Sequence, residues 1–152
     1  MKGYDEFKSV AIGCDHAAFE LKQAIKEYFT KKGFEVFDAV PVFMNPIPYV
    51  DTAGKVCRKV LENKGTLGIL ACGTGIGMSI AANRHKEISA AILYDDFTAE
   101  FSRRHTNANV IVFGARTMKN EDVERRIEIF LSNEFEGGKY AERNRLLDEP
   151  DI

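Results

Sequence analysis

The chain of 152 residues has no tryptophan, only three cysteines and four prolines, and no large excess of charge of either sign. Its 21 Lys and Arg against 23 Asp and Glu give a formal net charge of −2. Such a balance creates no extended positive field, which disfavours nucleic acid and anionic membranes as partners. No apolar run approaches the roughly 20 residues that cross a bilayer, and the first nine residues lack the apolar core of a signal peptide. We therefore expect a cytoplasmic protein.

The cysteines, Cys14, Cys57 and Cys72, are odd in number and match no metal-binding spacing. This pattern disfavours both a disulfide framework and a zinc site. Neighbouring strands could bring Cys14 and Cys72 together for redox chemistry, although the chain has no C-x-x-C motif. The simplest expectation is three reduced thiols.

Apolar runs alternate with segments of helical period, the pattern of β-α units around a parallel sheet. Five strands are predicted, at residues 9–13, 35–38, 66–71, 88–93 and 109–113. The helices are predicted at residues 17–32, 51–63, 96–105 and 121–132, with a further one beginning near Ile76 and running to residue 84. Asp51 or Thr52 is expected to cap the second helix. The length fits one α/β domain spanning residues 1–152.

Three segments lie outside this alternation. Residues 1–8 form an N-terminal extension. The loop at residues 39–48 contains three prolines and cannot be regular helix; whether it closes over a ligand is left open. Residues 135–152 are predicted to form a C-terminal arm with a glycine joint before a short helix. Lys139 and Arg143 are four residues apart and share one face of that helix. They could hold a phosphate there, or the face could simply be charged and solvated.

A glycine-rich turn at residues 72–77, Cys-Gly-Thr-Gly-Ile-Gly, joins an apolar strand to a helix. This geometry would aim several backbone N–H groups at one point, with the positive end of the helix dipole behind them. An anion is expected there. The same dipole would favour the thiolate form of Cys72 and let it act as a base or nucleophile. A cysteine merely buried beside a phosphate-binding turn is the alternative interpretation.

Ligands of an open parallel sheet bind at the carboxyl ends of its strands, so the residues that follow the predicted strands are candidates. They are Cys14, Asp15 and His16 after the first, Cys72 to Gly75 after the third, Tyr94, Asp95 and Asp96 after the fourth, and Arg116 after the fifth. Asp15 could instead only cap a helix, and Thr74 could only tighten its turn.

A dinucleotide-binding protein is disfavoured by the first predicted turn. That turn reads Gly-Cys-Asp-His at residues 13–16 rather than G-x-G-x-x-G, and its aspartate would repel a pyrophosphate. The glycine-rich run at residues 72–77 lies in the wrong β-α turn, and no Gly-Lys-Ser or Gly-Lys-Thr of a Walker loop follows it.

Five motifs occur in order along nearly the whole chain: residues 13–16, 72–83, 104–109 (Arg-His-Thr-Asn-Ala-Asn), 113–116 (Phe-Gly-Ala-Arg) and 135–138 (Phe-Glu-Gly-Gly). With them the chain resembles ribose-5-phosphate isomerase B and its relatives, including galactose-6-phosphate isomerase. The resemblance implies a Rossmann-like three-layer αβα sandwich with a five-stranded parallel sheet. It also implies active sites shared between the subunits of a homodimer or a tetramer of dimers, with no metal or organic cofactor.

The implied activity is a cofactor-independent aldose–ketose isomerisation of a phosphorylated sugar through a cis-enediolate. Cys72 would be the base, and Asp15, Thr74 and His105 would serve ring opening, with His105 supplied by the neighbouring subunit. The resemblance and the polar residues of its motifs also suggest a set of substrate-binding residues. They are His16, Gly73, Gly75, Gly77, Thr106, Asn109, Arg116, Lys139 and Arg143.

Departures from the family pattern concern the substrate. Thr106 replaces a usual asparagine, Lys139 a usual arginine and Tyr140 a usual histidine, and Tyr-Val-Asp-Thr-Ala at residues 49–53 replaces Tyr-Pro-Asp-Tyr-Ala. Ribose 5-phosphate and ribulose 5-phosphate, which would place the enzyme in the pentose phosphate pathway, are the expected pair. The alternative substrates are galactose 6-phosphate, allose 6-phosphate and a four-carbon sugar phosphate. The alternative function is that of a non-catalytic subunit that binds a sugar phosphate.

Overall fold

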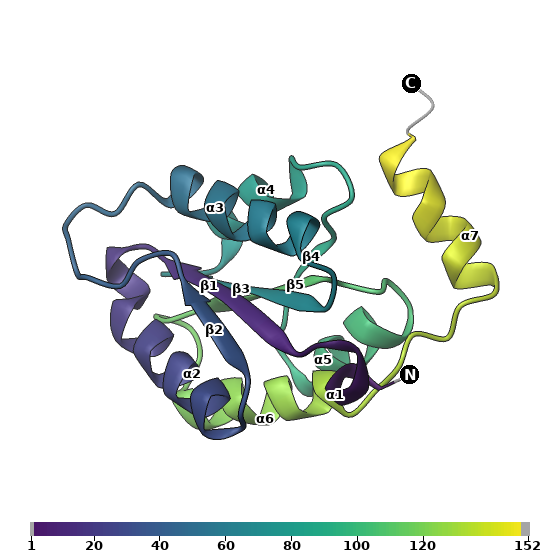
Figure 1. Ribbon diagram of the computed structural model, residues 1–152, viewed down its shortest axis with the longest axis horizontal. Helices are drawn as coiled ribbons and strands as arrows, with labels where there is room; N and C mark the ends of the chain where they lie inside the picture. The colour runs from purple at the N-terminus through teal and green to yellow at the C-terminus, as the bar shows by residue number, and fades with distance from the viewer. Residues whose placement is uncertain (1, 150–152) are drawn as a thin grey trace.

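A computed structural model describes residues 2–149 of the chain and contains one five-stranded sheet. Its strands are β1 (Ser9–Cys14), β2 (Glu35–Asp38), β3 (Thr66–Cys72), β4 (Ala90–Ile92) and β5 (Val110–Gly114). They pair in the order β2-β1-β3-β5-β4, and every pairing is parallel (Figure 1). All carboxyl ends therefore meet at one edge of the sheet, as the sequence pattern predicts.

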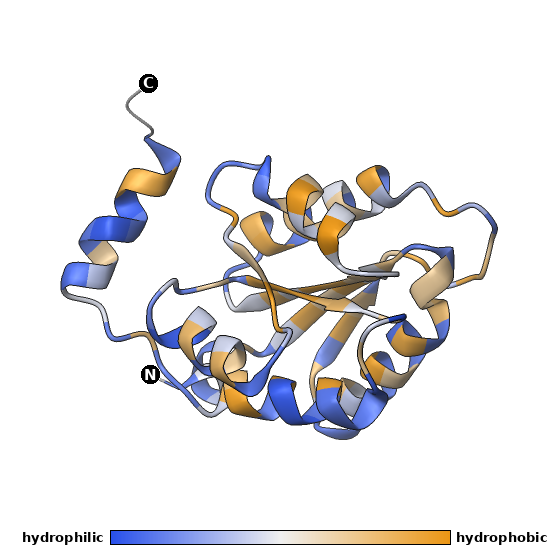
Figure 2. Cartoon of the chain, turned by 180° about the vertical axis from the view of Figure 1, so that it is seen from behind, coloured by the Kyte–Doolittle hydropathy of each residue, from blue (hydrophilic) through white to orange (hydrophobic). Residues whose placement is uncertain are grey.

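Helices cover both faces of the sheet (Figure 1). α3 (Tyr49–Glu62) and α4 (Ile76–Asn83) pack on one face, and α2 (Phe19–Lys31), α5 (Asp96–Arg104) and α6 (Asn120–Leu131) lie on the other. Two buried apolar clusters fill the spaces between the layers. Figure 2 shows the hydrophobic strands at the centre and hydrophilic stretches on the outer helices. The expected three-layer αβα sandwich is confirmed.

The N-terminal segment is more than an extension. Residues Gly3–Glu6 form the short helix α1, which packs against α6. Phe7 is buried and stacks on Phe130 with ring centroids 6.3 Å apart. The guanidinium of Arg103, itself buried, lies against both rings and pairs with Glu6 at 3.0 Å. These contacts join the start of the chain to the sandwich, and residues 2–7 are too few and too polar for the sequence to predict them.

The predicted cap of α3 is wrong. The helix begins at Tyr49, so Asp51 and Thr52 lie inside its first turn, and Pro48 occupies the N-cap position without a side-chain hydrogen bond. The Thr52 hydroxyl instead donates to the Pro48 carbonyl at 3.3 Å. Proline fixes its own φ near the helical value and removes one N–H, which lets a helix start directly after it without a polar cap.

A buried ion pair fixes the origin of the proline-rich loop. The Lys22 ammonium, fully buried, donates to Asp38 Oδ2 at 2.8 Å and to the Val40 carbonyl at 2.9 Å. Asp38 in turn accepts from the Val40 N–H at 2.9 Å. The hydrogen bonds of the Lys22 ammonium, and those to both oxygens of the Asp38 carboxylate, offset the cost of removing these charges from water. The loop thus leaves β2 along one path, tied to α2.

The C-terminal arm contains α7 (Lys139–Arg145) followed by a 3-10 turn, Leu146–Asp148. α7 stands away from the sandwich (Figure 1). Hydrogen bonds also tie these two segments to the body: Asn144 donates to the His105 carbonyl at 3.1 Å, and Asp148 accepts from the Glu87 N–H at 2.9 Å. The short helix after the Gly-Gly joint is confirmed, whereas Met1 of the predicted extension and residues 150–152 of the predicted arm lie outside the described residues.

Candidate active site

The thiol of Cys72 lies at the carboxyl end of β3, where the glycine-rich turn begins. Its sulfur accepts a hydrogen bond from the Gly75 N–H, with N to Sγ 3.2 Å apart. Gly75 adopts φ +87°, a left-handed conformation that a residue with a side chain rarely takes, and the carbonyl of Phe113 approaches within 3.3 Å of where a Cβ would stand. Glycine at this position therefore permits the turn that folds back onto the sulfur.

The turn that begins at Cys72 carries further backbone donors. Within residues 2–149 the N–H groups of Gly73 and Gly77 have no protein acceptor, while the Ile76 N–H donates to the Thr74 hydroxyl oxygen at 3.2 Å. α4 starts at Ile76, so its unpaired N–H groups and positive dipole end face the same turn. The strand, glycine-rich turn and helix start are arranged as the sequence predicts, and binding of an anion there stays a prediction.

Two further strand ends bring polar side chains to this turn. Arg116 follows β5 and packs over Gly73, with its Nη1 3.4 Å from the position of a Cβ built on that glycine. Asp15 follows β1, caps the short 3-10 turn His16–Ala18 by accepting from the Ala18 N–H at 3.1 Å, and stays partly exposed. The exposed His16 lies beside it. We call the residues around Cys72 the thiol cluster: Asp15, His16, Cys72, Gly73, Thr74, Gly75, Gly77 and Arg116.

A second cluster forms around His105, the C-cap residue of α5. The His105 ring stacks on Tyr140 of α7, with ring centroids 3.9 Å apart and planes 10° apart. Lys139 and Arg143 also lie against the Tyr140 ring, at 5.2 and 5.5 Å. Neither cation forms an ion pair with any carboxylate of residues 2–149, although Arg145 of the same helix pairs with Glu142. Together with Thr106, we call these residues the imidazole cluster.

The two clusters lie at opposite ends of the sheet. Cys72 pairs with Gly114 at the carboxyl end of β5, whereas His105 precedes Val110 at the amino end of the same strand. The four residue steps between Val110 and Gly114, at about 3.3 Å each, separate the two ends by roughly 13 Å. One chain therefore does not bring Cys72 and His105 together.

Asn109 belongs to neither cluster. Its side-chain oxygen accepts from the Ser89 N–H at 2.9 Å, and its amide donates to the Glu87 carbonyl at 2.9 Å. Both functions of the amide thus hold the turn before β4, which leaves this side chain a structural role rather than the predicted contact with substrate. The same bonds engage residues 87 and 89 in this turn, and β4 starts after it, two residues later than predicted.

Three residues near the clusters were not assigned roles from the sequence. The Tyr49 ring lies over Gly77, 3.2 Å from where a Cβ would stand. Glu136 and Tyr140 contact the His105 ring. Tyr49 opens the segment at residues 49–53, Glu136 lies in the motif at residues 135–138, and Tyr140 follows that motif by two residues. A motif in the sequence does not say which side chains are in contact.

The other thiols are core residues. Cys14 and Cys57 are fully buried, and burial raises the pKa of Cys14 to about 12 and that of Cys57 to about 11. Cys14 packs in the apolar cluster on the α2 side of the sheet, whereas Cys72 packs in the cluster on the α3 and α4 side. Since they lie on opposite faces, the redox pairing left open by the sequence is wrong.

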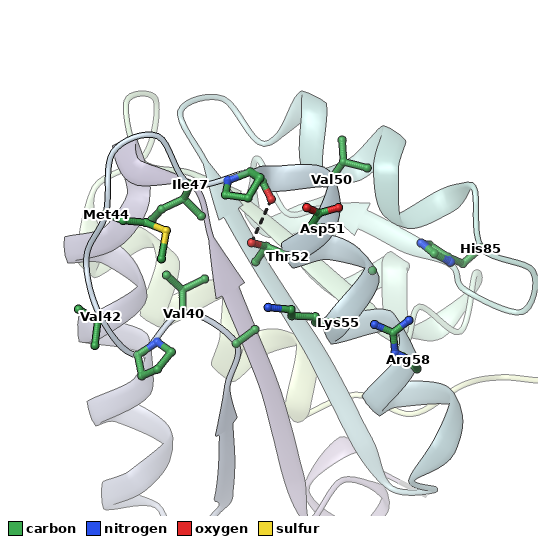
Figure 3. Close-up of a pocket in the computed structure, with 14 residues that line it drawn as sticks. Val40, Val42, Met44, Ile47, Val50, Asp51, Thr52, Lys55, Arg58 and His85 are labelled. Atoms are coloured by element: carbon green, nitrogen blue, oxygen red, sulfur yellow. Dashed lines mark hydrogen bonds between the residues drawn. The ribbon is translucent and has the colours of Figure 1, made fainter.

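A cavity of about 620 Å³ lies between the proline-rich loop and the outer face of α3 (Figure 3). Its walls are apolar on the loop side, with Val40, Met44 and Ile47, while Lys55 and Arg58 project from the helix. None of the predicted site residues lines this cavity. The loop connects it to Tyr49, which faces the thiol cluster.

The comparisons with known proteins decide the family. The family model described as Ribose/Galactose Isomerase matches residues 10–147. The chain belongs to the ribose/galactose isomerase family. Membership places this enzyme among the aldose–ketose isomerases of sugar phosphates, which confirms the class expected from the resemblance.

Relatives match along almost the whole length of this isomerase. A D-erythrulose-4-phosphate isomerase from Pectobacterium atrosepticum is 43% identical, over 88% of this chain and 88% of its own. The crystal structure of a ribose 5-phosphate isomerase from Thermotoga maritima superposes with a TM-score of 0.89 at 43% identity, covering 93% of this chain and 97% of its own. A ribose-5-phosphate isomerase B from Mycoplasma genitalium, solved with bound ribulose-5-phosphate, gives a TM-score of 0.87 at 35% identity, covering 93% and 94%.

No helix within residues 2–149 of this isomerase is both long and apolar enough to cross a membrane.

Proposed function

We propose that this isomerase interconverts ribose 5-phosphate and ribulose 5-phosphate, with Cys72 as the base. The observation that carries the proposal is the position of the Cys72 sulfur, 7% exposed as a residue and 3.2 Å from the Gly75 N–H, beside the unpaired N–H groups of Gly73 and Gly77. A thiol and an anion cradle at one point are what proton abstraction next to a carbonyl requires. The Mycoplasma relative with bound ribulose-5-phosphate supports the choice of sugar.

The proposed reaction moves one carbon-bound proton. The Cys72 thiolate removes the proton from C2 of the open-chain aldose, and the bonding electrons form the C1–C2 double bond as O1 becomes negative. Backbone N–H groups of Gly73, Gly75 and Gly77 stabilise this oxygen, an effect worth about 3–4 kcal/mol for one well-placed donor in other enzymes. The proton then returns to C1, while the hydroxyl proton moves from O2 to O1, giving the ketose.

A homodimer with shared sites is part of the proposal. The roughly 13 Å of strand between the two ends keeps Cys72 and His105 of one chain apart, so the imidazole cluster of a second chain would complete each thiol cluster. Apolar side chains flank the exposed β4 edge and suit such a contact: Ile76 and Ile80 on α4, and Tyr94 and Phe97 near the start of α5, are all more than half exposed. Two such dimers would make the tetramer that the family resemblance also allows.

The remaining predicted residues divide between ring opening and phosphate binding. Asp15, Thr74 and the partner's His105 would open the cyclic sugar. His16 and Arg116 from one subunit, with Lys139 and Arg143 from the other, would hold the phosphate. The absence of any ion pair on Lys139, Arg143 or Arg116 within residues 2–149 supports this, because solvated cations without carboxylate partners are free to bind an anion. Thr106 would face the sugar hydroxyls.

One other substrate has specific support from a relative of this chain. The Pectobacterium relative is a D-erythrulose-4-phosphate isomerase, which acts on a four-carbon sugar phosphate, and Thr106 departs from the family pattern where the site would contact the sugar hydroxyls. A six-carbon phosphate, such as galactose or allose 6-phosphate, is the other choice within the class. A binding subunit without turnover is the alternative from a different class, against which the presence of both Cys72 and His105 argues.

The test is a panel of phosphorylated aldoses and ketoses, from four to six carbons, with product measured by a coupled assay. We expect the highest kcat/KM for ribose 5-phosphate. A higher value for a tetrose or hexose phosphate would move the assignment to that sugar. Binding of sugar phosphates without turnover of any member would instead establish the binding subunit.

The domain and location complete the proposal. We treat residues 1–152 as one isomerase domain in the cytoplasm. The three cysteines, all free thiols, support the location, because secreted proteins more commonly pair their cysteines.

A further inference from the structure

The carboxylate of Glu136 lies between the side chains of Arg104 and His105. Its Oε2 accepts from Arg104 Nε at 2.7 Å and lies 3.4 Å from His105 Nε2. The Glu136 backbone N–H also donates to the Arg104 carbonyl at 3.0 Å. Both the main chain and the side chain of Glu136 are therefore fixed against the end of α5.

The imidazole ring is held on its faces as well. Tyr140 stacks on His105 at 3.9 Å, and the Phe101 ring lies 4.6 Å away at 54°. Asn144 donates to the His105 carbonyl at 3.1 Å and so ties α7 to the same residue. Contact with two aromatic side chains restricts rotation of the ring about its Cβ–Cγ bond, which favours the orientation in which Nε2 lies nearest Glu136.

The chemistry of the pair determines where the hydrogen lies. A carboxylate bonded to a guanidinium accepts hydrogen bonds and donates none. A bare nitrogen lone pair 3.4 Å from this oxygen would be repelled by it, so the contact favours a hydrogen on the His105 nitrogen that lies nearest Glu136, whether the ring is neutral or charged. His105 Nδ1 has no hydrogen-bond partner among residues 2–149, which leaves it as the nitrogen available for proton transfer.

We propose that Glu136 is a positioning residue that fixes the Nε2–H tautomer of His105 and presents Nδ1 to the substrate. The inference rests on the proposed function, in which His105 transfers protons during ring opening. Glu136 itself acts only through His105. The role parallels the way in which a carboxylate orients a catalytic histidine in other enzymes, where the other ring nitrogen does the chemistry.

The test compares Glu136→Gln with Glu142→Gln in the full-length enzyme. Glu142 is a matched control, because it is also a surface glutamate bound to an arginine, Arg145 at 2.8 Å, but it belongs to no contact with His105. Long-range ¹H–¹⁵N spectra of imidazole, recorded above the pH at which histidine titrates, distinguish the two tautomers. The His105 signals are those lost in His105→Gln.

We expect the wild type and Glu142→Gln to show protonated Nε2 and unprotonated Nδ1. In Glu136→Gln the amide can donate to Nε2, so the Nδ1–H tautomer should become populated. kcat should fall at least about tenfold, since general acid–base catalysis is worth about 10²–10⁴-fold, while KM changes less than about twofold. An unchanged tautomer with unchanged kcat would overturn the inference.

Two more variants separate positioning from general stability. Arg104→Gln removes the other partner of the carboxylate and should keep the tautomer, because Glu136 still faces the ring. Glu136→Asp restores an acceptor and should recover the Nε2–H signal in part; it also carries the test if Glu136→Gln does not fold. Loss of the tautomer in Arg104→Gln, or no recovery in Glu136→Asp, would contradict a direct role.

Failure of this inference can be told apart from failure of the proposed function. If His105→Gln retains full isomerase activity, the proposed role of His105 is wrong, whatever the spectra show. If His105→Gln loses activity but Glu136→Gln keeps both its rate and the wild-type tautomer, only the role of Glu136 is wrong.

Discussion

The backbone N–H of Gly75 donates to the sulfur of Cys72 across 3.2 Å. This bond closes the glycine-rich turn on itself and holds the sulfur beside the start of α4, where the turn meets the apolar cluster that contains both Cys72 and Met78. Cys72 is 7% exposed and lies at the glycine-rich turn, whereas Cys14 and Cys57 are fully buried. The four predictions below begin with that difference.

Thiol labelling should select one cysteine. Because burial raises the pKa of Cys14 to about 12 and that of Cys57 to about 11, both stay protonated and inaccessible below pH 9 in the folded protein. Iodoacetamide at pH 8 should modify Cys72 alone, as peptide mass spectrometry can establish. A saturating sugar phosphate should slow the modification. Equal labelling of Cys14 or Cys57 in folded protein would contradict the assigned environments.

Cys72→Ala should abolish isomerisation and also exchange of the substrate C2 proton with solvent. A missing base should lower kcat by at least about 10²-fold. Exchange in D₂O, followed by proton NMR of ribose 5-phosphate, measures the step directly. Cys57→Ala is the matched control, since it removes a thiol from the same apolar cluster and should leave exchange intact. Exchange at the wild-type rate in Cys72→Ala would exclude this cysteine as the base.

Two inactive variants should restore activity to each other. In a mixture of Cys72→Ala and His105→Ala, a mixed dimer has one site with both residues and one site with neither. If subunits exchange at random, half the dimers are mixed, so about a quarter of the wild-type activity should return. Co-refolding at equal amounts followed by assay measures it. Sites built within a single chain would give no recovery at any ratio.

Asp38→Asn should destabilise the fold by about 3–5 kcal/mol at pH 7, because it leaves the buried Lys22 ammonium without its partner. Burial alone would raise the pKa of Asp38, but hydrogen bonds from Lys22, the Val40 N–H and Lys26 outweigh it and hold the pKa below its ordinary 3.8. The lowered pKa means that the ionised carboxylate stabilises the folded state above about pH 4, and this contribution is lost as pH falls through the folded pKa.

Denaturant unfolding from pH 7 to pH 3 tests the Asp38 prediction. The difference between wild type and Asp38→Asn should be constant down to about pH 5 and shrink below pH 4. Asp51→Asn, on the exposed side of α3 and without an ion pair in the described residues, should change stability by less than about 0.5 kcal/mol. A pH-independent difference for Asp38→Asn would show that its charge is not what matters.

The sheet and its helices follow from the sequence because burial on both faces leaves continuous apolar runs, as in β3 and β5, where every residue is buried. The predicted ends of helices and strands are wrong where the element does not begin at the residue that its sequence pattern indicates. α3 starts on Pro48 rather than on the polar Asp51, and Asn109 takes over the bonds at the start of β4. The helix at Gly3–Glu6 is too short for periodicity to reveal.

The turn around Cys72 could be predicted because its residues are contiguous, so their order alone fixes the geometry of strand, turn and helix. The contacts of His105 could not. They join residues 101, 105, 136 and 140 through the packing of α7, and a sequence gives no distance between segments that meet only in space.

The placement of the thiol and imidazole clusters at opposite ends of one sheet has a consequence for assays at low enzyme concentration. Each cluster would survive intact in a dissociated chain, correctly folded yet unable to turn over substrate. Dilution would then act as a reversible inhibitor: once most chains are monomers, the rate would fall with the square of the enzyme concentration, because the dimer concentration is proportional to the square of the monomer concentration.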